Sequence, residues 1–213
     1  FGAGVGHPVQ LDTPEHRAAL AFSRRLAADE GIVPRSPTSE LMATLYDQGK
    51  AAFVISGPWF VGDVSRPIAA VPLPVVSETG QPARPFLTVE GVFVAEGAAH
   101  PDLAAAFAAY LAGPEGAAIR RATGSQAVAV DGLPPSTDPV VRAVERQAEQ
   151  AVLMPTDPDV PQVWEALERA LRRVVRGATS PEAATAEAQA YYAVLARPVP
   201  EPANPWPYVA LGV

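Results

Sequence analysis

The side chains best suited to catalysis or metal binding are scattered in this sequence. His7, His16 and His100 stand far apart, and none has a second ligand at a spacing that a metal ion could use. The chain has no cysteine, which excludes disulfides, thiolate metal sites and a cysteine nucleophile. Ser56 lies in no Gly-x-Ser-x-Gly motif and has no base nearby in sequence. We therefore predict no catalytic residue, no metal and no cofactor.

A pair of carboxylates three residues apart is a second candidate for chemistry. Glu165 and Glu168 fall on one face of an expected helix, where two acids could share an acid–base role. Arg169, Arg172 and Arg173 follow within helical contact distance. Opposite charges three or four residues apart pair on a helix surface, so the pattern favours an exposed ion-pair network.

Two tryptophans at the ends of expected elements are the most informative residues. Trp59 closes the run LYDQGKAAFVISGPWF (residues 45–60), in which a helix end is followed by a short strand and a Gly-Pro turn. Trp164 opens a helix after the proline-rich loop MPTDPDVP (residues 154–161). A ring at an element end can face a cleft and stack on a ligand. The alternative is that each ring packs in the core, which is the more common use of an isolated tryptophan.

Bulk composition narrows the class of protein. The chain has 213 residues, 48% of them hydrophobic, and a mean hydropathy of +0.09. These values predict a soluble globular protein of one domain or two closely joined lobes. The formal net charge of −7 offers no basic stripe that could neutralise phosphates, so we do not expect nucleic acid as a partner.

Prolines that follow a capping or turn residue mark the expected helix starts, because the first helical position needs no amide hydrogen. Six such starts are Thr13-Pro14, Ser36-Pro37, His100-Pro101, Gly113-Pro114, Asp138-Pro139 and Ser180-Pro181. A seventh helix is predicted from about Gln162 to Arg176, ending at Gly177. Short strand-like runs cover residues 52–56, 68–73, 87–95 and 127–130. Helices that alternate with short strands predict an α/β fold.

The order and spacing of these features resemble the extracellular solute-binding proteins of ABC importers, in particular their maltose-binding-protein-like carbohydrate group. In that family an aromatic helix end, a Gly-Lys/Glu-x-Ala motif, a strand and Gly-Pro-Trp follow one another. The corresponding residues here are Tyr46, Gly49-Lys50-Ala51-Ala52, residues 53–56 and Gly57-Pro58-Trp59. Further matches are residues 71–74, 80–82 and 85–86, the segment from His100-Pro101 to Gly116, and the segment from Met154-Pro155 to Trp164. The resemblance runs from about Gln10 to Leu195.

The resemblance implies an α/β, periplasmic-binding-protein-like fold with one largely complete lobe plus part of a second lobe. Residues 1–86 and 141–196 would belong to the first lobe and residues 87–140 to the partial second lobe. The resemblance also implies that Trp59 and Trp164 stack on sugar rings in a cleft, with Tyr46 and Glu168 among the ligand-binding residues. Glu168 stands where the maltose-binding relatives have an arginine. A carboxylate can accept two hydroxyl hydrogen bonds, so the sugar need not be maltose.

The expected function is therefore that of a periplasmic or extracytoplasmic solute-binding component of an ABC importer. Its partners would be a small-molecule solute, in particular an oligosaccharide, and the ABC permease subunits. The alternative is a degenerate, non-binding scaffold domain, which buried tryptophans would favour.

The resemblance covers only the C-terminal half, or somewhat more, of such a binding protein. The chain is then either a fragment of a longer protein or a reduced domain attached to a permease subunit. Residues 197–213 are expected to be a proline-rich linker with an apolar end, Tyr208 to Val213. This end could be the start of a membrane-spanning helix that attaches the protein to the membrane, or a tail strand that docks on the body of the protein. By itself this end is far shorter than the roughly 20 residues that span a bilayer.

Overall fold

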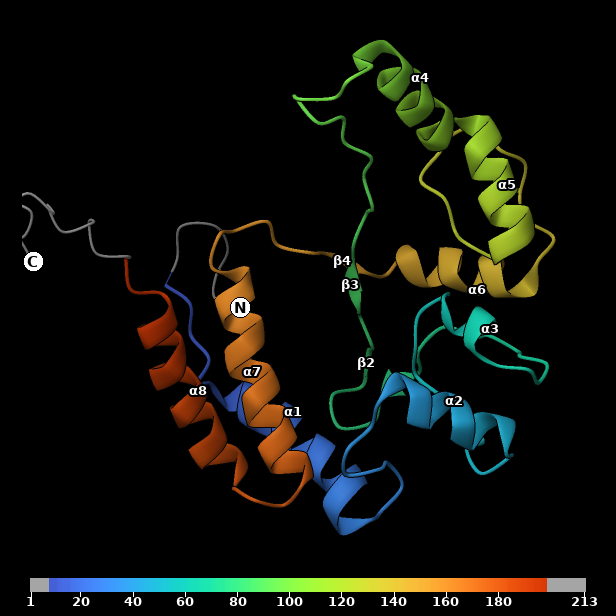
Figure 1. Cartoon of the computed structure of the whole chain (residues 1–213). Coiled ribbons are helices and arrows are strands. Elements are labelled where there is room, and N and C mark those ends of the chain that lie inside the picture. The colour runs from blue at the N-terminus through green and yellow to red at the C-terminus, as the bar shows by residue number, and fades with distance from the viewer. Residues whose placement is uncertain (1–7, 199–213) are drawn as a thin grey trace, which may run out of the picture. The chain divides into compact units, whose positions relative to one another are not determined.

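The computed structural model describes residues 8–198, which form two compact units (Figure 1). Unit 1 combines the described residues up to Ser36 with those from Thr156 onward, and unit 2 is the stretch from Pro37 to Pro155. The predicted lobe ranges remain a prediction. Most of the predicted linker and the apolar end lie outside the described residues.

Unit 1 is a group of three helices that pack against one another (Figure 1, blue, orange and red). They are α1 (Pro14–Arg24), which runs into a π-helical turn (Arg25–Asp29), α7 (Val160–Val175) and α8 (Pro181–Leu195). Small side chains at the contact between α7 and α8 allow the two helices to approach closely. The buried core consists of Leu11, Leu20, Val163, Ala166, Ala170, Val174, Ala184, Ala188 and Tyr192.

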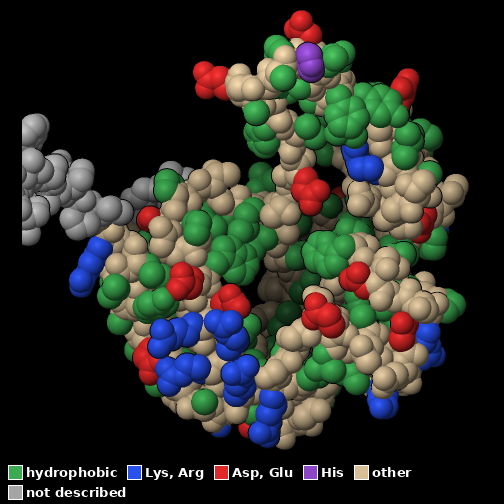
Figure 2. Space-filling model, in the orientation of Figure 1, with side chains coloured by type: hydrophobic (Ala, Val, Ile, Leu, Met, Phe, Trp, Pro, Cys, Tyr) green, Lys and Arg blue, Asp and Glu red, His purple; other side chains and the backbone are tan. Residues whose placement is uncertain are grey.

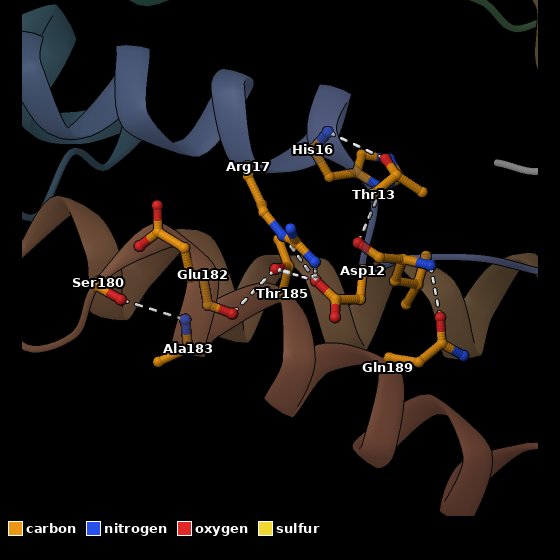
Figure 3. A network of polar contacts seen from close by, with 10 residues as sticks. Asp12, Thr13, His16, Arg17, Ser180, Glu182, Ala183, Thr185 and Gln189 are labelled. Atoms are coloured by element: carbon orange, nitrogen blue, oxygen red, sulfur yellow. Dashed lines mark hydrogen bonds and ion pairs between the residues drawn. The ribbon is translucent and has the colours of Figure 1, made fainter.

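A polar network ties the N-terminal segment of unit 1 to α8 (Figure 3). The Asp12 carboxylate accepts hydrogen bonds from the Thr185 hydroxyl, at 2.7 Å, and from the Arg17 guanidinium, at 2.7 and 2.9 Å. One residue earlier, the Leu11 amide donates to Gln189 Oε1 at 2.6 Å. Thr185 is fully buried, so its hydroxyl needs these partners. The hydrogen bond from Thr185, and then the bond and charge of Arg17, lower the pKa of Asp12.

Unit 2 carries the remaining helices, α2 (Ser39–Asp47), α3 (Phe60–Asp63), α4 (Pro101–Ala112), α5 (Pro114–Gly124) and α6 (Pro139–Ala148). Its strands are two residues long. Strand β1 (Val75–Val76) pairs antiparallel with β2 (Gln81–Pro82), and β3 (Phe86–Leu87) pairs parallel with β4 (Val152–Leu153). The Gln147 side chain on α6 joins this helix to the hairpin region, accepting from the Leu73 amide at 2.7 Å and donating to the Ala83 carbonyl at 3.3 Å.

Five of the six proline-marked helix starts are confirmed, because α1, α4, α5, α6 and α8 all begin at the named proline. The start at Ser36-Pro37 is wrong by two residues. There Thr38 is the N-cap, and its hydroxyl accepts from the Leu41 amide at 3.2 Å. The helix predicted from Gln162 is α7, which begins two residues earlier. It ends before Gly177, whose φ of 74° is the left-handed conformation that glycine commonly adopts after a helix.

The predicted strands are mostly wrong. Residues 52–56, 68–73 and 127–130 form no strand, and of residues 87–95 only Leu87 does, at the end of β3. A strand exists only where a neighbour accepts and donates its backbone hydrogen bonds. Within residues 8–198, the backbone of residues 52–56 and of residues 88–94 makes no hydrogen bond to another segment. These residues have the composition of strands but lack a partner.

Candidate ligand-binding residues

Trp59 lies at the N-cap of α3, and its ring folds back over the preceding turn. A Cβ atom placed on Gly57 would lie less than 3.0 Å from three carbons of the indole, closer than real Cβ atoms come. Glycine at this position therefore leaves the space in which the ring lies. Trp59 is still 67% exposed, so the turn covers only part of its indole.

Tyr46 lies near the end of α2, which contacts α3. Its ring meets the buried Phe60 edge to face, with the ring centroids 5.7 Å apart. Its hydroxyl donates to the Pro67 carbonyl at 2.8 Å. The neighbouring Asp47 carboxylate accepts from the amides of Ser65 and Arg66. These contacts fix the end of α2 against the loop after α3, so Tyr46 helps to position the turn that carries Trp59.

Trp164 lies on the exposed side of α7 in unit 1 and is 45% exposed. Its neighbours Val163 and Ala166 face the core, which turns the indole away from it. Glu168 follows one turn later on the same side of the helix. Its carboxylate pairs with Arg172 at 3.1 Å, and both side chains are well exposed. The structure therefore brings Trp164 and Glu168 together on α7, and Tyr46 and Trp59 together on two contacting elements of unit 2.

The predicted ion-pair network on α7 is confirmed in part, for the pair of Glu168 and Arg172. Arg172 pairs with Glu168, and Arg173 pairs with Glu187 of α8. Glu165 differs from the prediction, because it accepts a hydrogen bond from the Tyr191 hydroxyl. This bond to a carboxylate raises the pKa of Tyr191, since ionised tyrosine could not donate it.

A groove of about 310 Å³ between α7 and α8 was not foreseen from the sequence. Alanines from both helices form its floor, and Arg169 lies over the Tyr191 ring at its rim, 5.0 Å from the centroid. The long side chains of Arg169, Arg173, Glu187 and Tyr191 line the groove beside these alanines. Trp164 and Glu168 do not line this groove.

The other lowered pKa values belong to helix starts. Backbone amides hydrogen-bond the carboxylates of Glu15, Glu40 and Glu182 and lower the pKa of each. The pKa of Asp138 is lowered by the Ser125 hydroxyl, which donates to Oδ2 at 2.6 Å.

Among residues 8–198 no group of three or more acidic or histidine side chains could hold a metal ion. No helix in this same part of the chain is long and apolar enough to cross a membrane.

Comparisons with solved structures define the fold. A cyclo/maltodextrin-binding protein complexed with maltotetraose superposes with a TM-score of 0.71 at 25% identity, covering 90% of this chain and 51% of that one. The maltose-maltodextrin binding protein of Alicyclobacillus acidocaldarius gives a TM-score of 0.73 at 21% identity, covering 86% of this chain and 51% of that one. The predicted periplasmic-binding-protein-like α/β fold, present in part, is thereby confirmed.

Residues 3–156 match the family model described as bacterial extracellular solute-binding protein, and the chain belongs to this family. A curated relative is the galactooligosaccharide-binding protein of Bacillus subtilis, 27% identical over 172 residues. That match covers 75% of this chain and 40% of the relative. The chain thus spans about half the length of the two solved structures and less than half the length of the curated relative. Membership of an extracellular family places its site of action outside the cytoplasm.

Proposed function

We propose that this chain is part of the solute-binding component of an ABC importer and that its ligand is an oligosaccharide. The observation that carries the proposal is the exposure of two tryptophans, Trp59 at the N-cap of α3 in unit 2 and Trp164 in the second turn of α7 in unit 1. One relative is named as a galactooligosaccharide-binding protein, and one solved structure is named as a complex with maltotetraose. Both names support the same ligand class.

The chemistry of stacking fits these side chains. One face of a pyranose presents C–H groups that pack on an electron-rich ring, while its hydroxyl groups need polar partners at the edge. The Trp59 ring lies against the turn at Gly57, and this contact limits the freedom that the side chain can lose on binding. Trp164 has the Glu168 carboxylate one turn away as an acceptor for sugar hydroxyls.

Tyr46 contributes to the proposed site through its ring. Its hydroxyl already donates to the Pro67 carbonyl, so a ligand would contact the aromatic surface rather than the hydroxyl oxygen. The hydroxyl bond also keeps the ring against Phe60, next to Trp59 in the chain.

The finer parts of the proposal concern partners and location. The family role implies docking on ABC permease subunits. Attachment to the inner membrane through residues 197–213, or fusion to a permease subunit, belongs to the same proposal.

The alternative function is that of a scaffold domain that binds no ligand. Exposure of both indoles favours binding, because a scaffold has no need to keep two large rings in solvent.

Ligand-dependent melting tests the proposal. Maltotriose, maltotetraose and galactooligosaccharides are added to the purified protein, since a ligand that binds only the folded state raises the melting temperature. We expect a rise with at least one of these sugars and its loss in Trp59→Ala and Trp164→Ala. Val194→Ala, which trims an exposed apolar side chain of α8, is the matched control and keeps the response. A well-folded protein that responds to no sugar of the panel would count against oligosaccharide binding.

A further inference from the structure

Exposure by itself does not place an aromatic ring where a sugar can stack on it. Large apolar side chains are exposed at many positions of the chain, and hydrophobic side chains are spread over the visible face of the molecule (Figure 2). A ring on a loosely held turn loses more freedom when a ligand orders it, and this loss weakens binding. The contacts that hold the turn of Trp59 therefore matter as much as the exposure of its indole.

Trp59 lies in a loop that is held at one place. Residues 57–67, which we call the Trp59 loop, contain the Gly-Pro-Trp turn, α3 and the segment that follows α3. The carbonyls of residues 57–59 accept hydrogen bonds from amides of the same loop. Every hydrogen bond that joins the Trp59 loop to another part of residues 8–198 ends on Tyr46 or Asp47, the last two residues of α2.

Asp47 makes most of these bonds, and it makes them to backbone amides. Its Oδ1 accepts from the Ser65 amide at 2.9 Å and from the Arg66 amide at 3.2 Å, and its Oδ2 accepts from the Ser65 amide at 3.2 Å. Hydrogen bonds to a carboxylate are charge-assisted and stronger than those between neutral groups. Because the donors belong to the backbone, the bonds fix the path of the chain after α3.

The Arg66 side chain adds a bond in the opposite direction. Its Nη1 donates to the Tyr46 carbonyl at 3.3 Å, and its guanidinium lies beside Gly49. A Cβ atom on Gly49 would lie 2.6 Å from Nη1, so glycine leaves the space that the guanidinium occupies. The end of α2 and the end of the Trp59 loop thus exchange bonds both ways.

The effect of this anchor reaches the indole through two rings. Tyr46 donates to the Pro67 carbonyl at 2.8 Å and packs edge to face on Phe60. Phe60 is buried and follows Trp59 directly in the chain. A shift of the Trp59 loop on α2 would therefore move Phe60 and, with it, the N-cap residue Trp59.

We propose that Asp47 is a positioning residue for Trp59, because its carboxylate fixes the Trp59 loop on α2 and thereby sets the place of the indole. The consequence for sugar affinity rests on the proposed function, whereas the position of the ring does not. Without the carboxylate, the amides of Ser65 and Arg66 lose their acceptor. The Trp59 ring then moves among several positions and stacks less well on a sugar.

Fluorine NMR of protein labelled with fluorotryptophan tests the position of the ring in the absence of sugar. We expect Asp47→Ala to shift or broaden the Trp59 signal and to leave the signal of Trp164, in unit 1, in place. Asp47→Asn, whose amide oxygen can still accept from Ser65 and Arg66, should largely keep the parent signal. Asp131→Ala, which removes an exposed carboxylate elsewhere in unit 2, is the matched control and should change neither signal.

Three results of this experiment would overturn the inference. The first is an unchanged Trp59 signal in Asp47→Ala. The second is an equal shift in Asp47→Ala and Asp47→Asn, which would mean that the oxygen acceptor does not matter. The third is a shift of the Trp59 and Trp164 signals together, which would mean that Asp47 supports the fold as a whole.

Calorimetric titration with maltotetraose and with a galactooligosaccharide measures the consequence for binding. Asp47→Ala should bind about threefold to tenfold more weakly than the parent protein, the loss expected for a misplaced aromatic contact. Asp131→Ala should stay within about twofold of the parent. Parent-like affinity of Asp47→Ala would overturn the role of Asp47 in binding. A parent protein that binds neither sugar would contradict the proposed function, and the fluorine signals would still decide whether Asp47 positions the ring.

Discussion

The indole ring of Trp59 lies directly over the backbone of Gly57, in space that any larger residue would occupy. Gly57→Ala must therefore displace the ring while leaving the tryptophan in the chain. Because an aromatic contact contributes about 0.5–1.5 kcal/mol, we expect the variant to weaken oligosaccharide binding up to roughly tenfold. Fluorescence titration in a Trp206→Phe background measures this.

Gly62→Ala is the matched control, since a Cβ at Gly62 meets nothing within 4 Å. It should bind as tightly as the parent protein. Unchanged affinity in Gly57→Ala would show that the position of the Trp59 ring does not matter to the ligand.

Substitutions at Glu168 and at its ion-pair partner Arg172 distinguish a structural role of Glu168 from a role in ligand binding. Both side chains are exposed, so their ion pair should change the free energy of unfolding by no more than about 0.5 kcal/mol. Glu168→Ala should nevertheless reduce sugar affinity several-fold, because it removes an acceptor for hydroxyl groups. Arg172→Gln breaks the same pair but keeps the carboxylate, and it should retain most of the affinity. Calorimetric titration compares the two variants, and equal losses would contradict the assignment of Glu168 as a ligand contact.

Thr185 should contribute to the stability of unit 1 through its buried hydroxyl. Thr185→Val keeps the shape of the side chain but removes the hydrogen bond to Asp12, and we expect a loss of about 1 kcal/mol in urea unfolding. Thr123→Val removes an exposed hydroxyl of α5 that donates to its own helix, and its effect should be within about 0.5 kcal/mol of zero. Similar effects of the two substitutions would mean that the link between Asp12 and α8 is not stabilising.

Stability should fall as the protein is acidified. The folded-state pKa values of Asp12, Glu15, Glu40 and Glu182 lie below their ordinary values of 3.8 for aspartate and 4.5 for glutamate. A lowered pKa adds stability that is fully present above the ordinary value and is lost as the pH falls through the folded-state value. Melting temperatures should therefore decline below about pH 4.5, and Asp12→Asn should make the decline shallower. A constant melting temperature from pH 6 to pH 3 would contradict this.

Local signals predicted the helices well. Pro14, Pro101 and Pro181 each open a helix, because capping and the missing amide hydrogen act within one turn. The helix start predicted at Pro37 is two residues too early, because Thr38 provides the side-chain cap and Ser36 does not.

Long-range relationships could not be predicted in the same way. Residues 52–56 have the pattern of a strand, but a strand depends on a neighbour that the pattern cannot supply. The bond between Thr185 and Asp12 joins residues 173 positions apart, and the contact of Trp59 with Gly57 depends on the direction of one ring. The candidate residues could be chosen from the sequence and the family resemblance, whereas their packing required the structure.

The indole N–H signals of the tryptophans provide the most direct test of the central claim, that Trp59 and Trp164 bind an oligosaccharide. The chain has three tryptophans, so three signals are expected, and Trp→Phe variants assign each one. On titration with maltotetraose or a galactooligosaccharide, the account predicts that the signals of Trp59 and Trp164 shift in a saturable manner, with Trp206 as the internal reference. Signals of Trp59 and Trp164 that stay in place up to millimolar concentrations of every sugar tested would contradict it.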